Sequence, residues 1–128
     1  MYKFVEYLTN SILKIQLSQN NKILGEIRIY INSYNSKSFI TNIKICHKYS
    51  NNGLGRKLLS YTETKLQKEY NIKEIELTSY EKQGDTLNEF YLKQNYRKTN
   101  MNLKPDYIDD GEYIYNLYHF KKSFKDIF

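Results

Sequence analysis

Two glycines, Gly53 and Gly55, stand where an apolar run gives way to a leucine-rich segment, a place where the backbone itself can bind a ligand. Glycine permits positive φ angles and lets backbone amides come close to a bound group. Amides at a helix start, with the positive end of the helix dipole behind them, form an anion site suited to phosphates. The pattern therefore predicts a phosphate-binding turn, and an ordinary strand-to-helix turn is the alternative. A P-loop does not fit, because no Lys-Ser or Lys-Thr pair follows the glycines, and no third glycine completes a dinucleotide fingerprint.

A strand before this turn and a helix after it must position the glycines. Isoleucines that alternate with polar residues predict a strand over residues 38–46. Leucines at four-residue spacing predict a helix that begins at residue 52 or 53, continues to about residue 70 and ends at Asn71.

The rest of the chain alternates between strand and helix patterns. Further strands are predicted at residues 12–17, 23–31, 72–78, 96–103 and 113–120, with a short helix at about 86–94. In the second of these strands Ile23 is expected on the inner face with the later isoleucines, and Gly25 suggests a bulge or a close backbone approach. The order predicts an α/β (α+β) fold, with a mixed sheet of about six to seven strands and helices packed on it. Residues 1–128 are expected to form a single domain.

Composition narrows the function classes. The net charge of +6 rests on lysines spread along the whole chain, whereas nucleic-acid recognition more often shows clustered arginines, so nucleic acid is an unlikely partner. Coenzymes with several phosphates remain compatible with this charge. The lone Cys46 cannot form an internal disulfide, which favours a reducing, cytoplasmic compartment. No apolar run could span a membrane, so no membrane partner is expected.

Four segments together resemble the GNAT superfamily of acyl-CoA N-acyltransferases (acetyltransferases). The family's phosphate motif, Gln/Arg-x-x-Gly-x-Gly/Ala, appears as residues 50–55, and the apolar strand before it as residues 43–49. The family's Phe-Tyr-x-Lys-x-Gly-Phe is similar to residues 90–96, and its glycine-containing second strand to residues 22–25. The resemblance covers residues 12 to 120.

The resemblance implies acetyl-CoA (coenzyme A) as co-substrate, with no metal. Backbone amides would bind the pyrophosphate at Asn51, Asn52, Gly53, Leu54, Gly55 and Arg56. The strand edge of Ile43, Lys44 and Ile45 would pair with the pantetheine arm, and an amide near Ile45 would polarise the thioester carbonyl. An amine would attack the thioester directly, without a covalent enzyme intermediate.

The resemblance also places Tyr91 where family members often have a tyrosine that protonates the departing thiolate. A half-buried aromatic residue at helical spacing is the alternative for Tyr91. The general base is harder to find, because residues 38–46 contain no Asp or Glu. His47, which follows this strand, is the catalytic candidate chosen, since histidine titrates near neutral pH. The other candidates are His119, Glu26 and Glu76, or water. Cys46 has no matched partner and is expected to be a small core residue.

Several departures from the family pattern bear on activity. Ser50 replaces the usual Gln or Arg, Gly84 stands where many members have an Asn, and Asn95 replaces a glycine. The two helices that members commonly have between their first and second strands are absent, so the acceptor cleft should be open, or completed by a second copy in a homodimer. A non-catalytic acyl-CoA-binding or interaction module is therefore the main alternative to an N-acetyltransferase. A small basic nucleic-acid-binding domain is the less favoured one.

The amine acceptor itself is not identified by the sequence. An acidic cluster lies before the last predicted strand and consists of Asp106, Asp109, Asp110 and Glu112. By the resemblance this loop borders the acceptor entrance, which suggests a small polyamine-like or lysine-bearing acceptor of modest charge. A solvated hairpin is the alternative.

Overall fold

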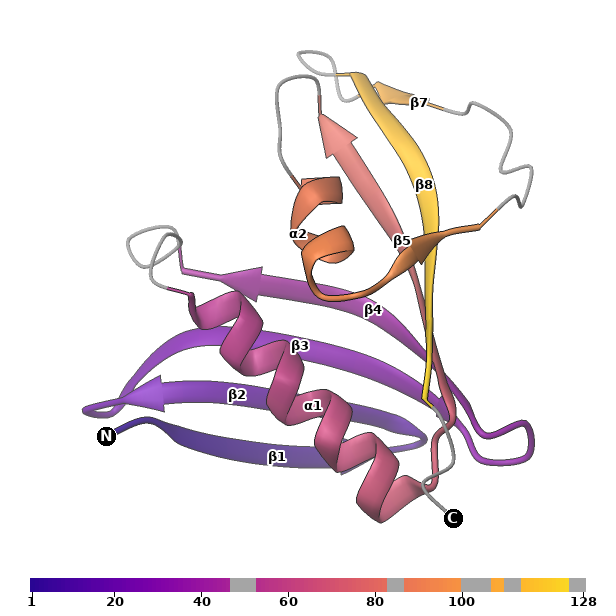
Figure 1. Cartoon of the computed structure of the whole chain (residues 1–128). Coiled ribbons are helices and arrows are strands. Elements are labelled where there is room, and N and C mark those ends of the chain that lie inside the picture. The colour runs from indigo at the N-terminus through magenta and orange to yellow at the C-terminus, as the bar shows by residue number, and fades with distance from the viewer. Residues whose placement is uncertain (47–52, 83–86, 100–106, 110–113, 125–128) are drawn as a thin grey trace.

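The computed structural model describes residues 1–46, 53–82, 87–99, 107–109 and 114–124. The described residues form eight strands and two helices (Figure 1). The elements in chain order are β1 (Lys3–Thr9), β2 (Ile12–Gln19), β3 (Lys22–Asn32), β4 (Lys37–Ile45), α1 (Leu54–Tyr70), β5 (Glu74–Lys82), α2 (Leu87–Lys93), β6 (Arg97–Lys98), β7 (Tyr107–Asp109) and β8 (Ile114–Ser123). The predicted mixed sheet with helices packed on it is confirmed, and β1 and β7 are strands that were not predicted.

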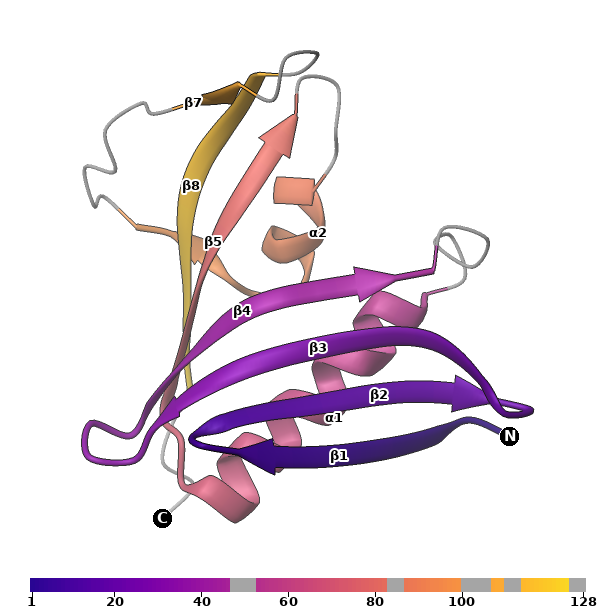
Figure 2. The same cartoon turned by 180° about the vertical axis from the view of Figure 1, so that it is seen from behind.

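The sheet consists of two arms that share one parallel junction. Its strand order is β1-β2-β3-β4-β5-β8-β6, and β7 pairs with β8. All neighbouring strands are antiparallel except β4 and β5, which are parallel. Figure 1 shows β1 to β4 as one arm with α1 across it, and β5, β8 and α2 as the other arm. From behind, the face of β1 to β4 has no helix in front of it (Figure 2).

Residues with positive φ angles form the tight turns between the first strands. Asn20 and Asn21, with φ of 52° and 64°, join β2 to β3, as predicted. Asn10 and Ser11, with φ of 50° and 68°, join β1 to β2 in the same way. Two residues with positive φ match the right-handed twist of a hairpin. The first two predicted strands, at residues 12–17 and 23–31, are β2 and β3, and a tight turn without a helix joins them, as predicted. The turn between the additional strand β1 and β2 is equally short.

A bulge in β3 corrects the prediction for Ile23. Leu17 pairs with Gly25 and Ser18 pairs with Ile23, so Leu24 is an extra residue in β3. The extra residue reverses the alternation: Leu24 is buried, and Ile23 is 57% exposed instead of lying on the inner face. The close approach predicted at Gly25 is confirmed, because a Cβ there would lie 2.6 Å from Ile45 Cδ1 and 3.2 Å from the Lys44 carbonyl oxygen.

The core lies between the sheet and the helices. Each of the longer strands contributes alternate aliphatic side chains, and α1 contributes leucines at helical spacing. The most deeply buried side chains are Phe120, Leu13, Ile15, Leu17, Ile27, Ile29, Leu54, Leu58, Leu59, Leu66, Ile75 and Leu77. Helix α1 begins and ends where predicted, with Gly53 and Asn71 as its caps in the left-handed conformation. Asn95, just beyond α2, has a φ of 69°, as expected for a residue that closes a helix.

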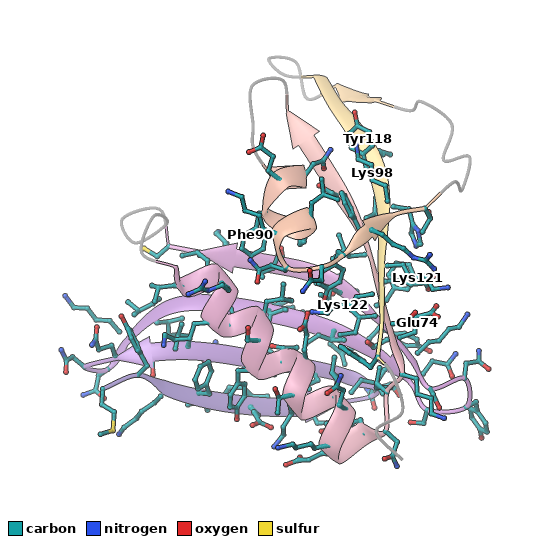
Figure 3. The ribbon with its side chains drawn as sticks, in the orientation of Figure 1. Glu74, Phe90, Lys98, Tyr118, Lys121 and Lys122 are labelled. Atoms are coloured by element: carbon teal, nitrogen blue, oxygen red, sulfur yellow. The ribbon has the colours of Figure 1, made fainter. Side chains whose placement is uncertain are left out.

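A polar bridge connects the two arms, and Figure 3 labels one of its residues, Lys122. The Glu63 carboxylate on α1 accepts a hydrogen bond of 2.8 Å from Tyr96 Oη and one of 2.8 Å from Lys122 Nζ on β8. Lys122 Nζ also donates to the Gln94 carbonyl oxygen at 2.9 Å. A hydrogen-bonded ion pair with little exposure holds its partners in one arrangement.

One predicted strand is only partly described. The pattern predicts a strand over residues 96–103, and the structure has β6 at Arg97–Lys98, while residues 100–103 lie outside the described part of the chain.

Candidate functional site

The two arms separate at the junction between β4 and β5 and leave a cleft. The parallel pairing extends only from Lys37 with Glu74 to Ile40 with Leu77. Beyond these pairs the strands diverge, as Figures 1 and 2 show. The resulting cavity has a volume of about 130 Å³ and is lined by Ile40, Thr41, Asn42, Ile43, Leu77, Thr78, Ser79 and Tyr91.

The facing strand edges in this cleft are free to pair with a ligand. Beyond Ile40, β4 pairs with β3 on its other side, and beyond Leu77, β5 pairs with β8 on its other side. The N–H and C=O groups that point into the cleft therefore have no strand opposite them in the described part of the chain. Such edges bind extended ligands through strand-like hydrogen bonds. A bulge at Thr41, where Arg28 pairs with Asn42 and Ile29 with Ile40, bends β4 at the closed end of the cleft.

The three predicted pantetheine-binding residues of β4 do not share one environment. Ile43 lines the cleft. Lys44 lines a separate hollow of about 340 Å³ at the ends of β3 and β4. The Ile45 side chain is partly buried beside α1, 3.8 Å from the point where a Gly55 Cβ would lie. Only their backbone edge, therefore, can serve a common ligand.

The N-terminus of α1 provides backbone donors next to the cleft. Gly53 caps the helix with a φ of 71°, and the first helical hydrogen bond runs from Lys57 N–H to the Gly53 carbonyl oxygen at 3.1 Å. The amides of Leu54, Gly55 and Arg56 precede this bond and so have no partner within the helix. No acidic residue occupies the first turn, which leaves the positive end of the helix dipole uncompensated there. The predicted contacts Asn51 and Asn52, and Ser50 before them, lie outside the described residues.

Gly55 has a different role from the one the sequence suggested. Of the two motif glycines only Gly53 has a positive φ, so the expectation of positive φ is wrong for Gly55. A Cβ on Gly55 would lie 3.3 Å from Phe90 Cζ and 3.8 Å from Ile45 Cγ1. Figure 3 labels Phe90 on α2, close to the start of α1. A Cβ there would be in tight contact with the Phe90 ring and in ordinary contact with Ile45, so a larger side chain requires Phe90 to move.

Tyr91 lies in the cleft, as its predicted role requires. Helix α2 places the ring against three aromatic neighbours, with centroid distances of 5.3 Å to Phe90, 6.0 Å to Tyr96 and 5.4 Å to Phe120. The side chain is 4% exposed and lines the cavity. Burial raises the pKa of Tyr91 to about 12, so the hydroxyl keeps its proton at neutral pH.

Two of the candidate bases come together on the outer face of the sheet. His119 on β8 is buried, and its Nε2 lies 3.5 Å from Glu76 Oε1 on β5. Its Nδ1 lies 2.7 Å from Thr99 Oγ1. Glu26 is apart from this pair: hydrogen bonds from Gln16 at 3.0 Å and from Arg28 at 2.9 Å lower its pKa. His47 lies outside the described residues.

Cys46 corrects a further prediction, because it is exposed instead of buried in the core. It follows the last residue of β4 and lines the hollow that also contains Lys44. Nothing in its surroundings marks it as a nucleophile, since no basic partner pairs with it in the described part of the chain.

The acidic cluster proposed for the acceptor entrance is largely outside the described residues. Asp106, Asp110 and Glu112 lie there, as do Gly84 and Asp85. Asp109 ends β7 and pairs with Ile114 of β8.

Thr78 and Thr99 are site residues that the sequence did not suggest. Thr78 lies in a predicted strand but was not predicted as a site residue. It could have been identified by considering the side chains on both faces of that strand. No local pattern marks Thr99, because its partner His119 comes from a distant strand.

Within the described ranges, no three His, Cys, Asp or Glu side chains are grouped so that they could bind a metal ion. The described helices include none with the length and apolar character that a membrane crossing requires.

The chain is similar to acetyltransferases by sequence model and by structure. The model of the acetyltransferase (GNAT) family matches residues 4–96. The ribosomal-protein-S18-alanine N-acetyltransferase of Escherichia coli superposes with a TM-score of 0.73 at 18% identity, over 91% of this chain and 71% of that chain. A GNAT family acetyltransferase of Elizabethkingia anophelis, crystallised with acetyl-CoA, gives 0.70 at 17% identity, over 96% and 98%. A spermidine/spermine N-acetyltransferase of Vibrio cholerae gives 0.75 at 14%, over 89% and 66%. No curated protein sequence matches significantly.

Proposed function

The chain belongs to the acetyltransferase (GNAT) family, and from this premise we propose that it transfers an acetyl group from acetyl-CoA to a primary amine. The observation that carries the proposal is the cleft between β4 and β5, which has unpaired strand edges on both sides and the Tyr91 ring in its wall. The E. anophelis structure was solved with acetyl-CoA bound, and it covers nearly the whole length of this chain.

The described residues fit such a coenzyme at two points. The amides of Leu54, Gly55 and Arg56 suit a pyrophosphate, because an uncompensated helix start attracts anions. The β4 edge beyond Ile40 suits the amide-containing pantetheine arm, which can pair with it as an added strand would. Acetyl-CoA supplies the activated thioester when bound.

Residues of the chain then supply orientation and proton transfer. An amide on the β4 edge polarises the thioester carbonyl, and it acts strongly because the cleft excludes much of the water. Tyr91 acts as the acid toward the departing thiolate, since its hydroxyl is protonated and its ring is fixed by three aromatic contacts. The amine attacks without an acyl-enzyme intermediate, because no described nucleophile with an activating base lines the cleft.

Binding and turnover of acetyl-CoA test the proposal. Acetyl-CoA at about 100 times its Kd should stabilise the protein by about 2.7 kcal/mol, which corresponds to a Tm increase on the order of 10 °C. Thiol release should then depend on an added primary amine. Gly55→Val should abolish the Tm increase, because its side chain would contact Phe90 and displace the helix start. Ser60→Val, on the exposed side of the same helix, should retain it.

The outcomes separate the proposal from its alternatives. Binding of acetyl-CoA without amine-dependent thiol release would indicate an acyl-CoA-binding module. Absence of both would contradict the proposal. The alternative of nucleic-acid binding is disfavoured by the pairing of four lysines with carboxylates among the described residues, as in Lys65 with Glu6 and Lys37 with Glu74.

A further inference from the structure

Glu76, His119 and Thr99 form a hydrogen-bonding group on the face of the sheet away from α1. The atoms in contact are Glu76 Oε1 and His119 Nε2, 3.5 Å apart, and His119 Nδ1 and Thr99 Oγ1, 2.7 Å apart. His119 is 5% exposed, and the Glu76 side chain is 18% exposed. A solute can therefore reach the carboxylate, while the imidazole lies behind it.

This group lies at the closed end of the cleft. Glu76 immediately precedes Leu77, the last residue of β5 that pairs with β4. His119 pairs with Thr78, which lines the cavity, so the two side chains share the outer face of the sheet. Tyr91 enters the same cavity from the helix side, where it packs on Phe120. Tyr91 and the pair of Glu76 and His119 thus lie on opposite faces of the sheet, and the pair adjoins the cavity through Leu77 and Thr78 without lining it.

The ammonium groups of the two lysines nearest the pair are directed to Glu74 and not to Glu76. The nearby lysines on this face, Lys37 and Lys121, pair with Glu74 at 3.7 Å and 3.0 Å (Figure 3 labels Glu74 and Lys121). Lys121 is also the cross-strand partner of Glu76, and Arg97 of β6 lies on the other side of Lys121, so a substrate ammonium at Glu76 competes with these cations. From β4, the neutral Phe39 ring lies 6.3 Å from the His119 ring.

We propose that Glu76 and His119 form the acceptor site, in which Glu76 binds the substrate ammonium and His119 Nε2 accepts its proton; this rests on the proposed acetyl transfer. A distance of 3.5 Å is longer than a usual N–H···O bond, and one ammonium nitrogen can lie within hydrogen-bond distance of both atoms. The proposal places the proton of neutral His119 on Nδ1, where Thr99 Oγ1, 2.7 Å away, accepts it, and the lone pair on Nε2.

The step balances with the groups named. The ammonium loses one proton to Nε2, which leaves a neutral amine and an imidazolium next to the Glu76 carboxylate. The amine forms the new C–N bond to the thioester carbon, and the C–S bond breaks toward the Tyr91 hydroxyl. Tyr91 gives its proton to the thiolate and regains one from the new amide nitrogen. The imidazolium releases the remaining proton to solvent.

An apolar row beside Glu76 indicates the substrate class. Ile12 pairs with Tyr30, Tyr30 with Phe39, and Phe39 with Glu76, so the four side chains lie in a row across the outer face. Ile12, Tyr30 and Phe39 are 41%, 46% and 38% exposed. An acceptor that fits carries one primary ammonium next to an aromatic or aliphatic group, which makes it less polar than a polyamine.

Two nearly isosteric probes test the proposal. Phenethylamine is charged at pH 7, whereas O-benzylhydroxylamine is neutral and has no proton to lose before attack. His119→Gln should lower kcat for phenethylamine by about 10²- to 10⁴-fold and change the rate for O-benzylhydroxylamine by less than about fivefold. Thr99→Val should act in the same direction, and Thr99→Ser should restore the rate. Equal losses for both probes would mean a structural role and would overturn the proposal.

Binding readouts keep the test independent of turnover. Glu76→Gln and Tyr30→Ser should raise the KM of phenethylamine, whereas Tyr34→Ser, on the fully exposed turn before β4, should not. The chain has two histidines, so His47→Gln assigns the imidazole signals of His119 by NMR. Phenethylamine should shift these signals in the presence of coenzyme A, and the ¹⁵N signals should show the proton on Nδ1. No shift, or a proton on Nε2, would refute the site. A wild-type Tm unchanged by acetyl-CoA would instead refute the proposed function.

Discussion

Replacing Tyr91 with Phe removes one hydroxyl from the cleft and leaves the aromatic packing in place. The ring is held by Phe90, Tyr96 and Phe120, and all three contacts persist in Phe. We therefore expect a folded variant whose affinity for acetyl-CoA is nearly unchanged, so that any loss of kcat reports on the hydroxyl alone.

The size of the loss follows from the acidity of the phenol. Burial raises the pKa of Tyr91 to about 12, whereas an ordinary thiol has a pKa of about 8.5, a difference of about 5 kcal/mol. Complete proton transfer to a free thiolate is therefore uphill, and the hydroxyl acts chiefly as a hydrogen-bond donor until a late stage of C–S cleavage. A hydrogen bond to a charged group contributes about 1.5–3 kcal/mol, which corresponds to about a 10- to 150-fold decrease in kcat.

Initial rates of thiol release at saturating acetyl-CoA and amine measure this decrease, and calorimetry measures the Kd of the coenzyme. An unchanged kcat would remove Tyr91 from the mechanism. A decrease above about 10⁴-fold in a folded variant would show that the phenol has already transferred its proton in the rate-limiting transition state, which would contradict the late transfer inferred from its raised pKa.

The remaining predictions concern two glycines and alkaline stability. Gly53→Val should destabilise the fold by about 1–2 kcal/mol and weaken acetyl-CoA binding, because Gly53 has a φ of 71°. Asn tolerates this conformation, so Gly53→Asn should stay near wild type in denaturant titrations and in binding titrations. Gly25→Ala should lower the free energy of unfolding by about 1–3 kcal/mol, because its Cβ would lie 2.6 Å from Ile45 Cδ1; an added Ile45→Val should recover part of this loss, and no recovery would argue against the contact. Between pH 10 and 12 the free energy of unfolding should fall as pH rises, because an unfolded tyrosine loses its proton before Tyr91 does; in urea titrations, Tyr91→Phe should reduce this fall by up to about 3 kcal/mol, and identical pH profiles would show that Tyr91 is not buried as described.

Regular local patterns made much of the fold predictable. The leucine spacing of α1 and the alternation in β2 reflect burial against one face, which is a local property of the sequence. The turn at Asn20 and Asn21 was predictable because Asn tolerates positive φ.

β1 was missed because a carboxylate interrupts its inner face. Glu6 points toward α1, where it accepts a hydrogen bond from Tyr61 and pairs with Lys65 at 2.9 Å. Both partners belong to α1, far along the chain, so they cannot be inferred from the sequence of β1. Without them, the charged Glu6 breaks the alternation of apolar and polar residues that predicts a strand. The exposure of Ile23 was missed for a similar reason, since the bulge that turns it outward depends on the register with β2.

The candidate site likewise has some features that follow from local sequence and others that depend on tertiary packing. Tyr91 was singled out through a short motif and lies in the wall of the cleft, and its role as the acid stays a prediction. The neighbourhood of Glu76 and His119 depends on the pairing of β5 with β8, and the contact of Gly55 with Phe90 depends on how α2 approaches α1. Neither can be derived from spacing along the chain, because both are set by tertiary packing.

The polar bridge between the arms has a consequence for acyl-group selectivity. Glu63 belongs to the helix that packs on β3, while Lys122 and Tyr96 belong to the other arm. Their hydrogen bonds therefore restrain the angle between the two arms. The cleft therefore cannot widen for a longer acyl chain without breaking hydrogen bonds to the Glu63 carboxylate, which is only 13% exposed. If the proposed acetyl transfer holds, the acyl length that the protein accepts should depend on this bridge, outside the cleft, as well as on the side chains that line it.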